Sequence, residues 1–208
     1  MDRYRAIIFD LGNVIFNFSF DKTFEYWARI SGYDTNLLKQ RFQIDKMYHQ
    51  FERGEIEPEL YRNYLMPRLG LNINDAEFDN GWNDIYLDLL PGIEDLLQDL
   101  RVRYRLFVLT NTNKIHASKW RTKYKRVLIN FEKIFCSFEL GARKPEKRIY
   151  ERVLDFINEK PGSIIFFDDN ANNITGAIDA GIKGILVSST FQIIDKLVRL
   201  GIRIDYRK

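Results

Sequence analysis

The strongest constraint on the fold comes from short apolar segments that recur along the chain. Four of them are rich in Ile, Val, Leu or Phe without clean alternation: AIIF (6–9), LFVLT (106–110), SIIFF (163–167) and GILVS (184–188). Strands of this composition are typically covered on both faces, as they are in a parallel sheet. KIFCSF (133–138) is a candidate fifth strand. The sequence therefore predicts a buried parallel sheet.

Helical patterns separate these apolar segments. The segment 91–103 begins with a proline and places three leucines on one stripe. In the segment 144–157, Ile149, Val153 and Phe156 share one helix face. Strands that alternate with helices in this way indicate a doubly wound α/β sheet.

Residues 17–89 break the alternation of strands and helices. Amphipathic helices are expected at 20–32, 35–56 and 58–70, with turns at Gly32, Gly54 and Gly70. A chain of 208 residues accommodates one core domain with such an insertion. We therefore expect a core domain of residues 1–16 and 90–208 and an inserted α-helical cap of residues 17–89.

The charge balance argues against a dedicated nucleic-acid binder. The formal net charge is only +3, with 32 basic and 29 acidic residues interspersed. The most basic stretch, KWRTKYKRVL (119–128), carries Trp120 and Tyr124 among its cations. Aromatic residues between cations can stack on bases, but a solvated helix face is the preferred interpretation.

Other sequence features concern location and redox chemistry. A single cysteine, Cys136, excludes an internal disulfide and is interpreted as a buried strand residue rather than a reactive thiol. The N-terminal apolar run is too short for a signal peptide, and no run approaches the roughly 20 apolar residues of a membrane helix. We expect a cytoplasmic protein without a nucleic-acid or membrane partner, and the sequence does not indicate its oligomeric state.

Polar residues follow the predicted strands at the edge where ligands bind in open α/β sheets. They are Asp10, Thr110, Asn111, Lys144, Asp168, Asp169 and Asn170. Each alone is also explained as a helix cap or a turn residue. Together, however, the carboxylates repel one another unless a cation is bound, and ligands that are all oxygen suit Mg²⁺.

Four motifs occur in order: FDLGNV (9–14), LTNTN (109–113), RKPE (143–146) and FFDDNANN (166–173). In these motifs the sequence resembles the haloacid dehalogenase-like (HAD) superfamily, and the resemblance spans essentially the whole chain. FERGEI, LTNTNKIH and LGARKPEKRIY are similar more specifically to the bacterial α-D-glucose-1-phosphate phosphatase branch. The resemblance implies a phosphatase with an α-helical cap.

The resemblance also implies a role for each motif. Asp10 is expected to be the nucleophile that forms an aspartyl-phosphate, which water then hydrolyses. An Asp10 oxygen, the backbone carbonyl of Gly12 and the Asp169 carboxylate are expected to bind Mg²⁺, with Asp168 close behind Asp169 as a candidate ligand.

The expected phosphate-binding groups come from the second and third motifs. Thr110 is expected to donate its hydroxyl to a phosphate oxygen, helped by the backbone N–H of Asn111. Lys144 is expected to place its ammonium between Asp10 and the phosphate. The substrate implied is a small phosphate ester, in particular a sugar phosphate such as glucose 1-phosphate.

Gly12 departs from the superfamily pattern. Most of its phosphatases have an aspartate two residues after the nucleophile, which protonates the leaving oxygen. Such acid–base help is typically worth about 10²–10⁴-fold, so its loss slows the hydrolysis of ordinary alkyl phosphates. A sugar 1-phosphate suffers less because its hemiacetal oxygen is a better leaving group.

Four further residues have two interpretations each. His49 in the cap is either a substitute acid or sugar contact, or a packed surface histidine. His116, after the second motif, has the same two interpretations and begins a helix. Glu52 and Arg53 either line the substrate-facing turn of the cap or form a salt-bridged helix end.

Two other functions compete with the phosphatase. One is a metal-independent 2-haloacid dehalogenase, which also lacks a second aspartate, although the adjacent acids Asp168 and Asp169 argue against it. The other is a non-catalytic binding or regulatory protein with the same fold, which Gly12 favours and the intact Asp10 and Lys144 oppose.

Overall fold

The computed structural model describes residues 3–205 and contains a five-stranded parallel sheet. The strand order is β5-β4-β1-β6-β7. The strands are β1 (Ala6–Phe9), β4 (Arg105–Thr110), β5 (Lys133–Cys136), β6 (Ile164–Asp168) and β7 (Lys183–Leu186). All five coincide with the predicted apolar segments within two residues, so the predicted parallel sheet is confirmed.

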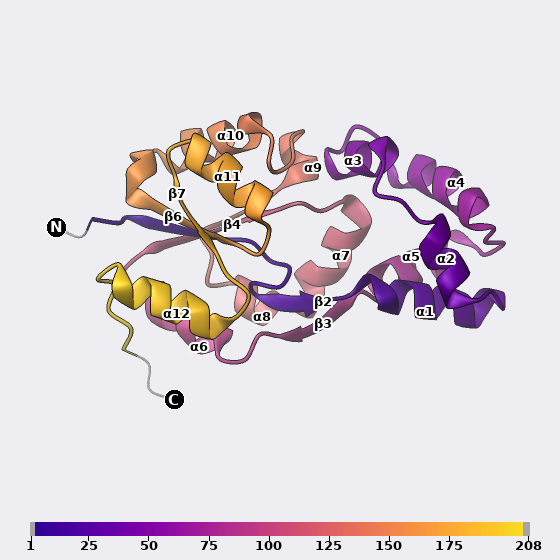
Figure 1. Cartoon of the computed structure of the whole chain (residues 1–208), viewed down its shortest axis with the longest axis horizontal. Coiled ribbons are helices and arrows are strands. Elements are labelled where there is room, and N and C mark those ends of the chain that lie inside the picture. Colours follow the sequence, from indigo (N-terminus) through magenta and orange to yellow (C-terminus); the bar gives the residue numbers. More distant parts are fainter. Residues whose placement is uncertain (1–2, 206–208) are drawn as a thin grey trace.

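Helices cover both faces of this sheet (Figure 1). One layer contains α10 (Lys147–Ile157) and α11 (Ala171–Asp179). The other contains α6 (Ile93–Leu100), α7 (Lys114–Lys123), α8 (Lys125–Leu128) and α12 (Thr190–Arg199). Short elements complete the core: α9 (Ser137–Leu140) and a 3₁₀ turn at Pro161–Ser163. The doubly wound architecture is confirmed.

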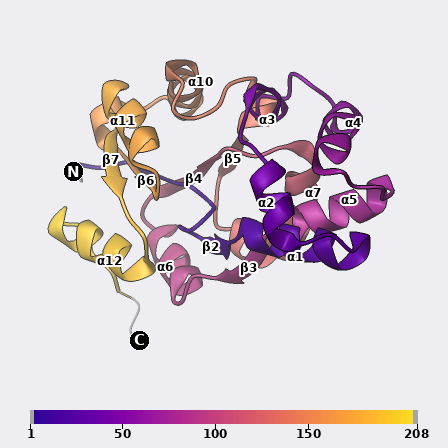
Figure 2. The ribbon, with the colours of Figure 1, turned by 45° about the vertical axis from the view of Figure 1, so that its right-hand side comes forward.

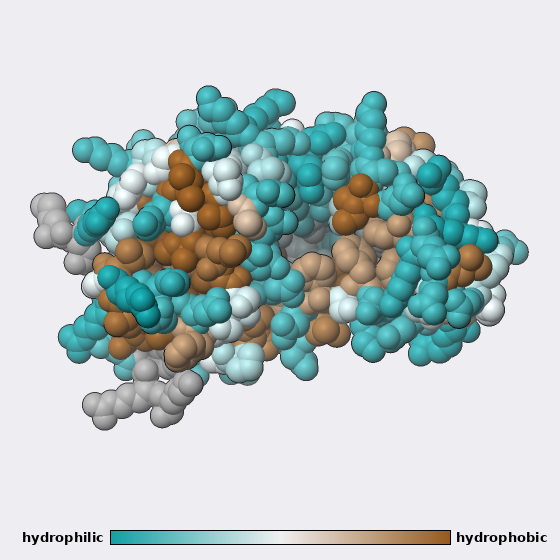
Figure 3. All heavy atoms as spheres, in the orientation of Figure 1, coloured by the Kyte–Doolittle hydropathy of each residue, from teal (hydrophilic) through white to brown (hydrophobic). Residues whose placement is uncertain are grey.

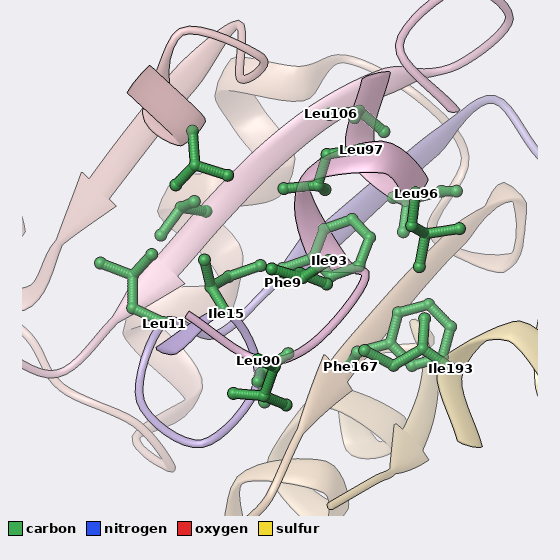
Figure 4. Packing of buried hydrophobic residues seen from close by; sticks show 14 of the residues in the cluster. Phe9, Leu11, Ile15, Leu90, Ile93, Leu96, Leu97, Leu106, Phe167 and Ile193 are labelled. Carbon is green, nitrogen blue, oxygen red and sulfur yellow. The ribbon is translucent and has the colours of Figure 1, made fainter. Parts of the chain in front are cut away.

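The central strand shows why its sequence does not alternate between polar and apolar residues. Ile7 and Phe9 pack toward the α6 and α12 side, whereas Ala6 and Ile8 pack toward the α10 and α11 side. All four are fully buried, so both faces of β1 select apolar side chains. Figure 4 shows Phe9 among apolar residues of the first cluster, including Ile93 from α6.

Five helices lie between residues 20 and 83, in the part of the chain where the sequence predicts an inserted helical cap. These helices are α1 (Phe20–Ser31), α2 (Thr35–Arg41), α3 (Lys46–Glu52), α4 (Pro58–Leu69) and α5 (Asp75–Asn83). They pack around an apolar cluster that also includes Ile115 of α7, and in it Trp27 and Trp82 are fully buried and stack at 5.8 Å. These helices lie together at one end of the molecule (Figure 2).

Two short strands connect this helical segment to the core. β2 (Phe16–Phe18) pairs antiparallel with β3 (Tyr86–Leu89), and we call this two-stranded sheet the stalk. The sequence pattern predicts neither strand, because segments of three and four residues are too short to show a period.

Two predicted helices have different bounds in the structure. The single helix expected at 35–56 is broken: Phe42 is extended, and the side chain of Asp45 caps a new helix through the N–H of Tyr48. The helix expected from residue 144 begins only at Lys147, because the preceding residues form the loop that carries Lys144. In that helix Phe156 is half exposed rather than part of the buried face.

The basic segment 119–128 is helical, as predicted, but its aromatic residues face inward. Trp120 and Tyr124 are 1% and 4% exposed, so neither ring is available for stacking on bases. Cys136 is fully buried at the end of β5, and burial raises the pKa of its thiol to about 12, which agrees with a structural role. No helix between residues 3 and 205 combines the length and apolar composition needed to cross a membrane.

Candidate active site

Parallel strand register brings the predicted site residues to one edge of the sheet. Phe9 of β1 lies opposite Val108 of β4 and Phe167 of β6, so the residues just beyond these positions are neighbours. Asp10 follows β1, and its backbone N–H donates to the Phe167 carbonyl at 2.8 Å. This edge faces the helical cap (Figure 1).

Lys144 joins two of the predicted carboxylates. Its Nζ lies 2.9 Å from Oδ1 of Asp10 and 2.6 Å from Oδ2 of Asp168. Burial alone lowers the pKa of Lys144, but the two carboxylates outweigh it and raise the pKa above its usual value. Burial raises the pKa of Asp10, and the lysine opposes that shift. Lys144 therefore remains a cation beside the nucleophile candidate.

Asp168 is saturated with hydrogen bonds. Its Oδ1 accepts from the Asn170 backbone N–H at 2.8 Å and from Nδ2 of Asn173 at 3.0 Å. Its Oδ2 accepts from Lys144 at 2.6 Å and from Asn173 at 3.1 Å. The residue is fully buried, so both oxygens are occupied by protein donors.

Asp169 has a different environment from that of its neighbour. It is exposed, and its Oδ2 accepts from Nδ2 of Asn13 at 2.9 Å. Asn13 has a left-handed φ of 55°, which the tight loop after Asp10 requires, and asparagine tolerates this conformation better than most residues. The loop after Asp10 thus holds the side chain of Asp169, which lines the cavity described below.

The loop that carries Lys144 is fixed by a side chain from the second motif. Asn111 donates from Nδ2 to the Lys144 carbonyl at 2.9 Å and accepts at Oδ1 from the Lys144 N–H at 2.8 Å. This paired contact holds the lysine backbone in place. The motif resemblance predicts a phosphate contact through the Asn111 backbone but not this role of its side chain.

The acidic cluster fits a small divalent cation. One carboxylate oxygen each from Asp10, Asp168 and Asp169 lies within 4.8 Å of the others. When ionised, these three aspartates and Lys144 carry a net charge of −2. All the candidate ligand atoms are carboxylate oxygens. Mg²⁺ matches both the charge and the ligand type.

A cavity of about 270 Å³ lies between the core edge and the cap. The residues that line it include Asp10, Gly12, Thr110, Asn111, Lys144 and Asp169. The structure thus brings the predicted site residues together, and the buried Asp168 lies directly behind them. The remaining wall is largely aromatic and aliphatic, with Phe16, Phe18, Phe20, Ile44, Tyr86 and Trp120. Figure 3 shows the surface hollowed between the two parts of the molecule, with apolar side chains on the cap side.

Ion pairs join the cap to the core beside this cavity. Nε of Arg143 lies 2.7 Å from Oε2 of Glu52, and both side chains are mostly buried. Arg53 also contacts Glu146 of the core at 3.0 Å. Glu52 lines the cavity, and its burial raises the pKa of its carboxyl while Arg143 lowers it. Glu52 therefore both lines the cavity and forms a salt bridge, whereas Arg53 forms a salt bridge only among the described contacts.

The two histidines differ in position. His49 lies on α3 and is not among the described residues that line the cavity, which fits a packed surface histidine rather than a substrate contact. His116 is the third residue of α7, lines the cavity and is 4% exposed. Its ring stacks on Trp82 at 4.9 Å, and burial lowers the pKa of His116 to about 3.

Replacing His116 by phenylalanine is expected to flatten the acid dependence of stability. Below about pH 6.5 the imidazole of His116 is protonated in the unfolded chain but stays neutral in the folded chain. Acid therefore favours unfolding. Between about pH 7.5 and about pH 5, this single group removes about 2 kcal/mol of the free energy of unfolding. Urea unfolding at both pH values tests the prediction, because His116→Phe retains the stacking ring and should lose about 2 kcal/mol less than the parent. An equal loss in both proteins would contradict a neutral, buried His116.

Comparison with known proteins identifies the family. The family model of haloacid dehalogenase-like hydrolases matches residues 4–181. The chain therefore belongs to the haloacid dehalogenase-like hydrolases, and the predicted superfamily is confirmed.

Individual relatives are more distant. D-ribitol-5-phosphate phosphatase of Bacteroides thetaiotaomicron is 22% identical over 175 residues, covering 82% of this chain and 85% of the relative. Sesquiterpene phosphatase astK of Aspergillus oryzae is 28% identical, covering 88% and 89%. Neither is named as a glucose-1-phosphate phosphatase, so that branch stays a prediction.

A solved structure shares most of this fold. The HAD family enzyme bt-2542 from Bacteroides thetaiotaomicron, in complex with magnesium and inorganic phosphate, aligns with a TM-score of 0.78 and 28% identity. The alignment covers 90% of this chain and 96% of that enzyme. The α/β HAD fold predicted from the sequence is therefore confirmed.

Proposed function

We propose that the protein is a Mg²⁺-dependent phosphatase that hydrolyses a small phosphomonoester, such as glucose 1-phosphate, through an aspartyl-phosphate on Asp10. The observation that carries this proposal is the placement of the Lys144 ammonium between Asp10 and Asp168, with Asp169 at the same edge. Relatives named as phosphatases of ribitol 5-phosphate and of sesquiterpenes support the reaction class.

In the proposed reaction a carboxylate oxygen of Asp10 forms a bond to phosphorus while the bond to the leaving oxygen breaks. Water then attacks phosphorus, releases inorganic phosphate and restores the Asp10 carboxylate. Two easier displacements thus replace one difficult displacement. The nearly complete burial of Asp10 limits competing hydration of the carboxylate.

Lys144, Thr110 and Asn111 neutralise the transferring group. The ammonium of Lys144 is already held beside Asp10, so it needs little rearrangement to meet a non-bridging phosphate oxygen. Thr110 ends β4 at the cavity and supplies a hydroxyl donor, and the backbone N–H of Asn111 follows it. The paired contact between the Asn111 side chain and the Lys144 backbone supports this arrangement.

We assign Asp169, Asp10 and the Gly12 carbonyl as the Mg²⁺ ligands. Asp168 is the weaker candidate because both of its oxygens already accept hydrogen bonds within a fully buried environment. Its role is instead to orient Lys144. When bound, Mg²⁺ supplies charge neutralisation and alignment of the phosphoryl group. A related enzyme crystallised with magnesium and phosphate supports the choice of metal.

The absence of an acid at Gly12 favours esters whose leaving oxygen needs little protonation. We expect a higher kcat/KM for glucose 1-phosphate than for glucose 6-phosphate, because a hemiacetal oxygen leaves more readily than a primary alkoxide. The loss of a general acid is worth about 10²–10⁴-fold, which is ample to produce a preference of at least about tenfold. Phosphate release from the two esters under identical conditions measures it, and equal rates would remove the leaving-group explanation.

A panel assay tests the reaction class itself. Purified protein is incubated with sugar phosphates, nucleotides and phenyl phosphate, with Mg²⁺ or with EDTA, and with a 2-haloacid in parallel. Phosphate release that requires Mg²⁺ supports the proposal. Halide release without metal would indicate the dehalogenase, and the absence of both products would indicate a non-catalytic protein.

We also propose the domain bounds expected from the sequence. Residues 1–16 and 90–208 are assigned to the core and residues 17–89 to the cap. The stalk strands β2 and β3 lie at the two junctions, which supports these bounds. A cytoplasmic location stays a prediction from the sequence.

A further inference from the structure

Position 12 is glycine for a steric reason. A Cβ built on Gly12 lies 2.7 Å from Cε1 and 2.8 Å from Cδ1 of Phe18, which is closer than carbon atoms of real side chains approach. Gly12 is not among the glycines with a positive φ, so its backbone conformation does not by itself demand glycine. A side chain at position 12 therefore requires the ring of Phe18, rather than the backbone, to move.

The local fold places that ring next to the loop that follows Asp10. The chain reverses directly after Asp10, and the Asn13 N–H donates to the Phe16 carbonyl at 2.7 Å. Phe18 then ends the stalk strand β2, opposite Tyr86 of β3. Its ring also packs edge-on against Phe20 at 6.1 Å. The ring therefore lies between Phe20 and the position that a side chain of residue 12 would take.

Both residues line the cavity next to Asp10, so the excluded side chain belongs to the reacting space. The other acids that line the cavity are already engaged. Asp169 accepts from Asn13, and Glu52 is paired with Arg143 at 2.7 Å. Phe18 thus occupies the space from which residue 12 would otherwise present a proton donor.

We propose that Phe18 is a specificity-determining residue. Its ring fills the volume of a side chain at position 12 and keeps a proton donor away from the leaving oxygen. The enzyme is thereby restricted to phosphate esters of acidic alcohols, such as phenols and hemiacetals, and disfavours simple alkyl phosphates. This inference rests on the phosphatase function proposed above.

The test exchanges the ring for an acid. Four variants are compared with the parent: F18A, G12D, G12D/F18A and G12N/F18A. The substrates are phenyl phosphate and methyl phosphate with saturating Mg²⁺, and the readout is the ratio of kcat/KM for methyl phosphate to that for phenyl phosphate. In G12D/F18A the introduced carboxylic acid donates its proton to the departing methoxide while the Asp10 oxygen bonds to phosphorus.

We expect G12D/F18A to raise the methyl-to-phenyl ratio at least about tenfold over F18A, a conservative part of the usual 10²–10⁴-fold value of general acid catalysis. G12N/F18A has nearly the same shape but no acidic proton, so its ratio should equal that of F18A. G12D alone should lose activity on both esters, because the ring leaves no room for the new side chain.

A measurement of stability, which does not depend on catalytic activity, tests whether the ring of Phe18 clashes with a side chain at position 12. G12A should lower the melting temperature of the parent and should lower it less in the F18A background. An equal effect in both backgrounds, or a G12D/F18A variant that does not fold, would overturn the steric claim.

An unchanged methyl-to-phenyl ratio in G12D/F18A, or an equal gain in G12N/F18A, would overturn the specificity claim. If the parent releases phosphate from neither ester nor from glucose 1-phosphate, the proposed function fails, and this inference fails with it.

Discussion

Asp10→Asn is expected to reduce phosphate release to background, a loss on the order of 10⁴-fold or more. The amide keeps the volume of the carboxylate but is a poor nucleophile, and it removes a negative charge beside Lys144 and the metal site. The measurement is kcat for phosphate release with saturating Mg²⁺. The loss should fall on kcat, because the covalent step itself is removed.

The fold should survive the Asp10→Asn change. Lys144 keeps its 2.6 Å contact with Asp168, so the buried ammonium retains a partner. Far-UV circular dichroism and the melting temperature provide the control. A folded Asp10→Asn protein that hydrolyses phosphate esters at more than a few per cent of the parental rate would contradict nucleophilic catalysis by Asp10.

Asp169→Ala is expected to abolish phosphate release even in excess Mg²⁺. In the parent protein, EDTA should abolish phosphate release reversibly. Without a cation, Asp10 and Asp169 face an incoming phosphate dianion with little screening, and the repulsion opposes binding and reaction. Activity is measured across a Mg²⁺ titration for the parent and the variant. Re-added Mg²⁺ should restore the parent but not Asp169→Ala.

A matched control comes from an acid outside the site. Glu151 lies on α10, where it pairs with Lys147 at 3.3 Å on an exposed face. Glu151→Gln removes one negative charge from the protein, as Asp169→Ala does, but should leave the Mg²⁺ dependence unchanged. Hydrolysis that continues unchanged in EDTA, or an Asp169→Ala variant that saturates with Mg²⁺ like the parent, would contradict the metal assignment.

The sequence predicted the sheet and its ligand edge because both depend on local patterns. Each strand is a short apolar run, and Asp10, Thr110 and Asp168 lie at or directly after the ends of such runs. Parallel pairing then requires these ends to meet. The five strands, the doubly wound order of elements and the approximate place of the acids therefore followed from composition and spacing.

The contacts that tune the site were not visible in the sequence. Asn13 and Asp169 are 156 positions apart, and their hydrogen bond exists only because two strand ends are adjacent. Asn173 lies within the fourth motif, but its bonds to Asp168 depend on the first turn of α11. The asparagines of these motifs were the available signal, since a buried carboxylate needs donors.

The cap was the least predictable part, for a related reason. Its helices pack around their own aromatic core, and this packing decides which residues face the cavity. His49 was the first candidate for a substitute acid, yet Glu52 one turn later lines the cavity and His49 does not. The break between α2 and α3 changes the rotation of the second helix relative to a continuous helix, and no local pattern revealed it.

The central claim is a covalent aspartyl-phosphate on Asp10, and trapping this intermediate tests it most directly. Parent enzyme with Mg²⁺ is mixed with glucose 1-phosphate or phenyl phosphate carrying labelled phosphorus and is quenched in acid within one turnover. The protein is then digested and the label is mapped. We expect label on the peptide that contains Asp10, and none when Asp10→Asn is treated identically. Turnover without labelled protein, or label on another residue, would contradict the account.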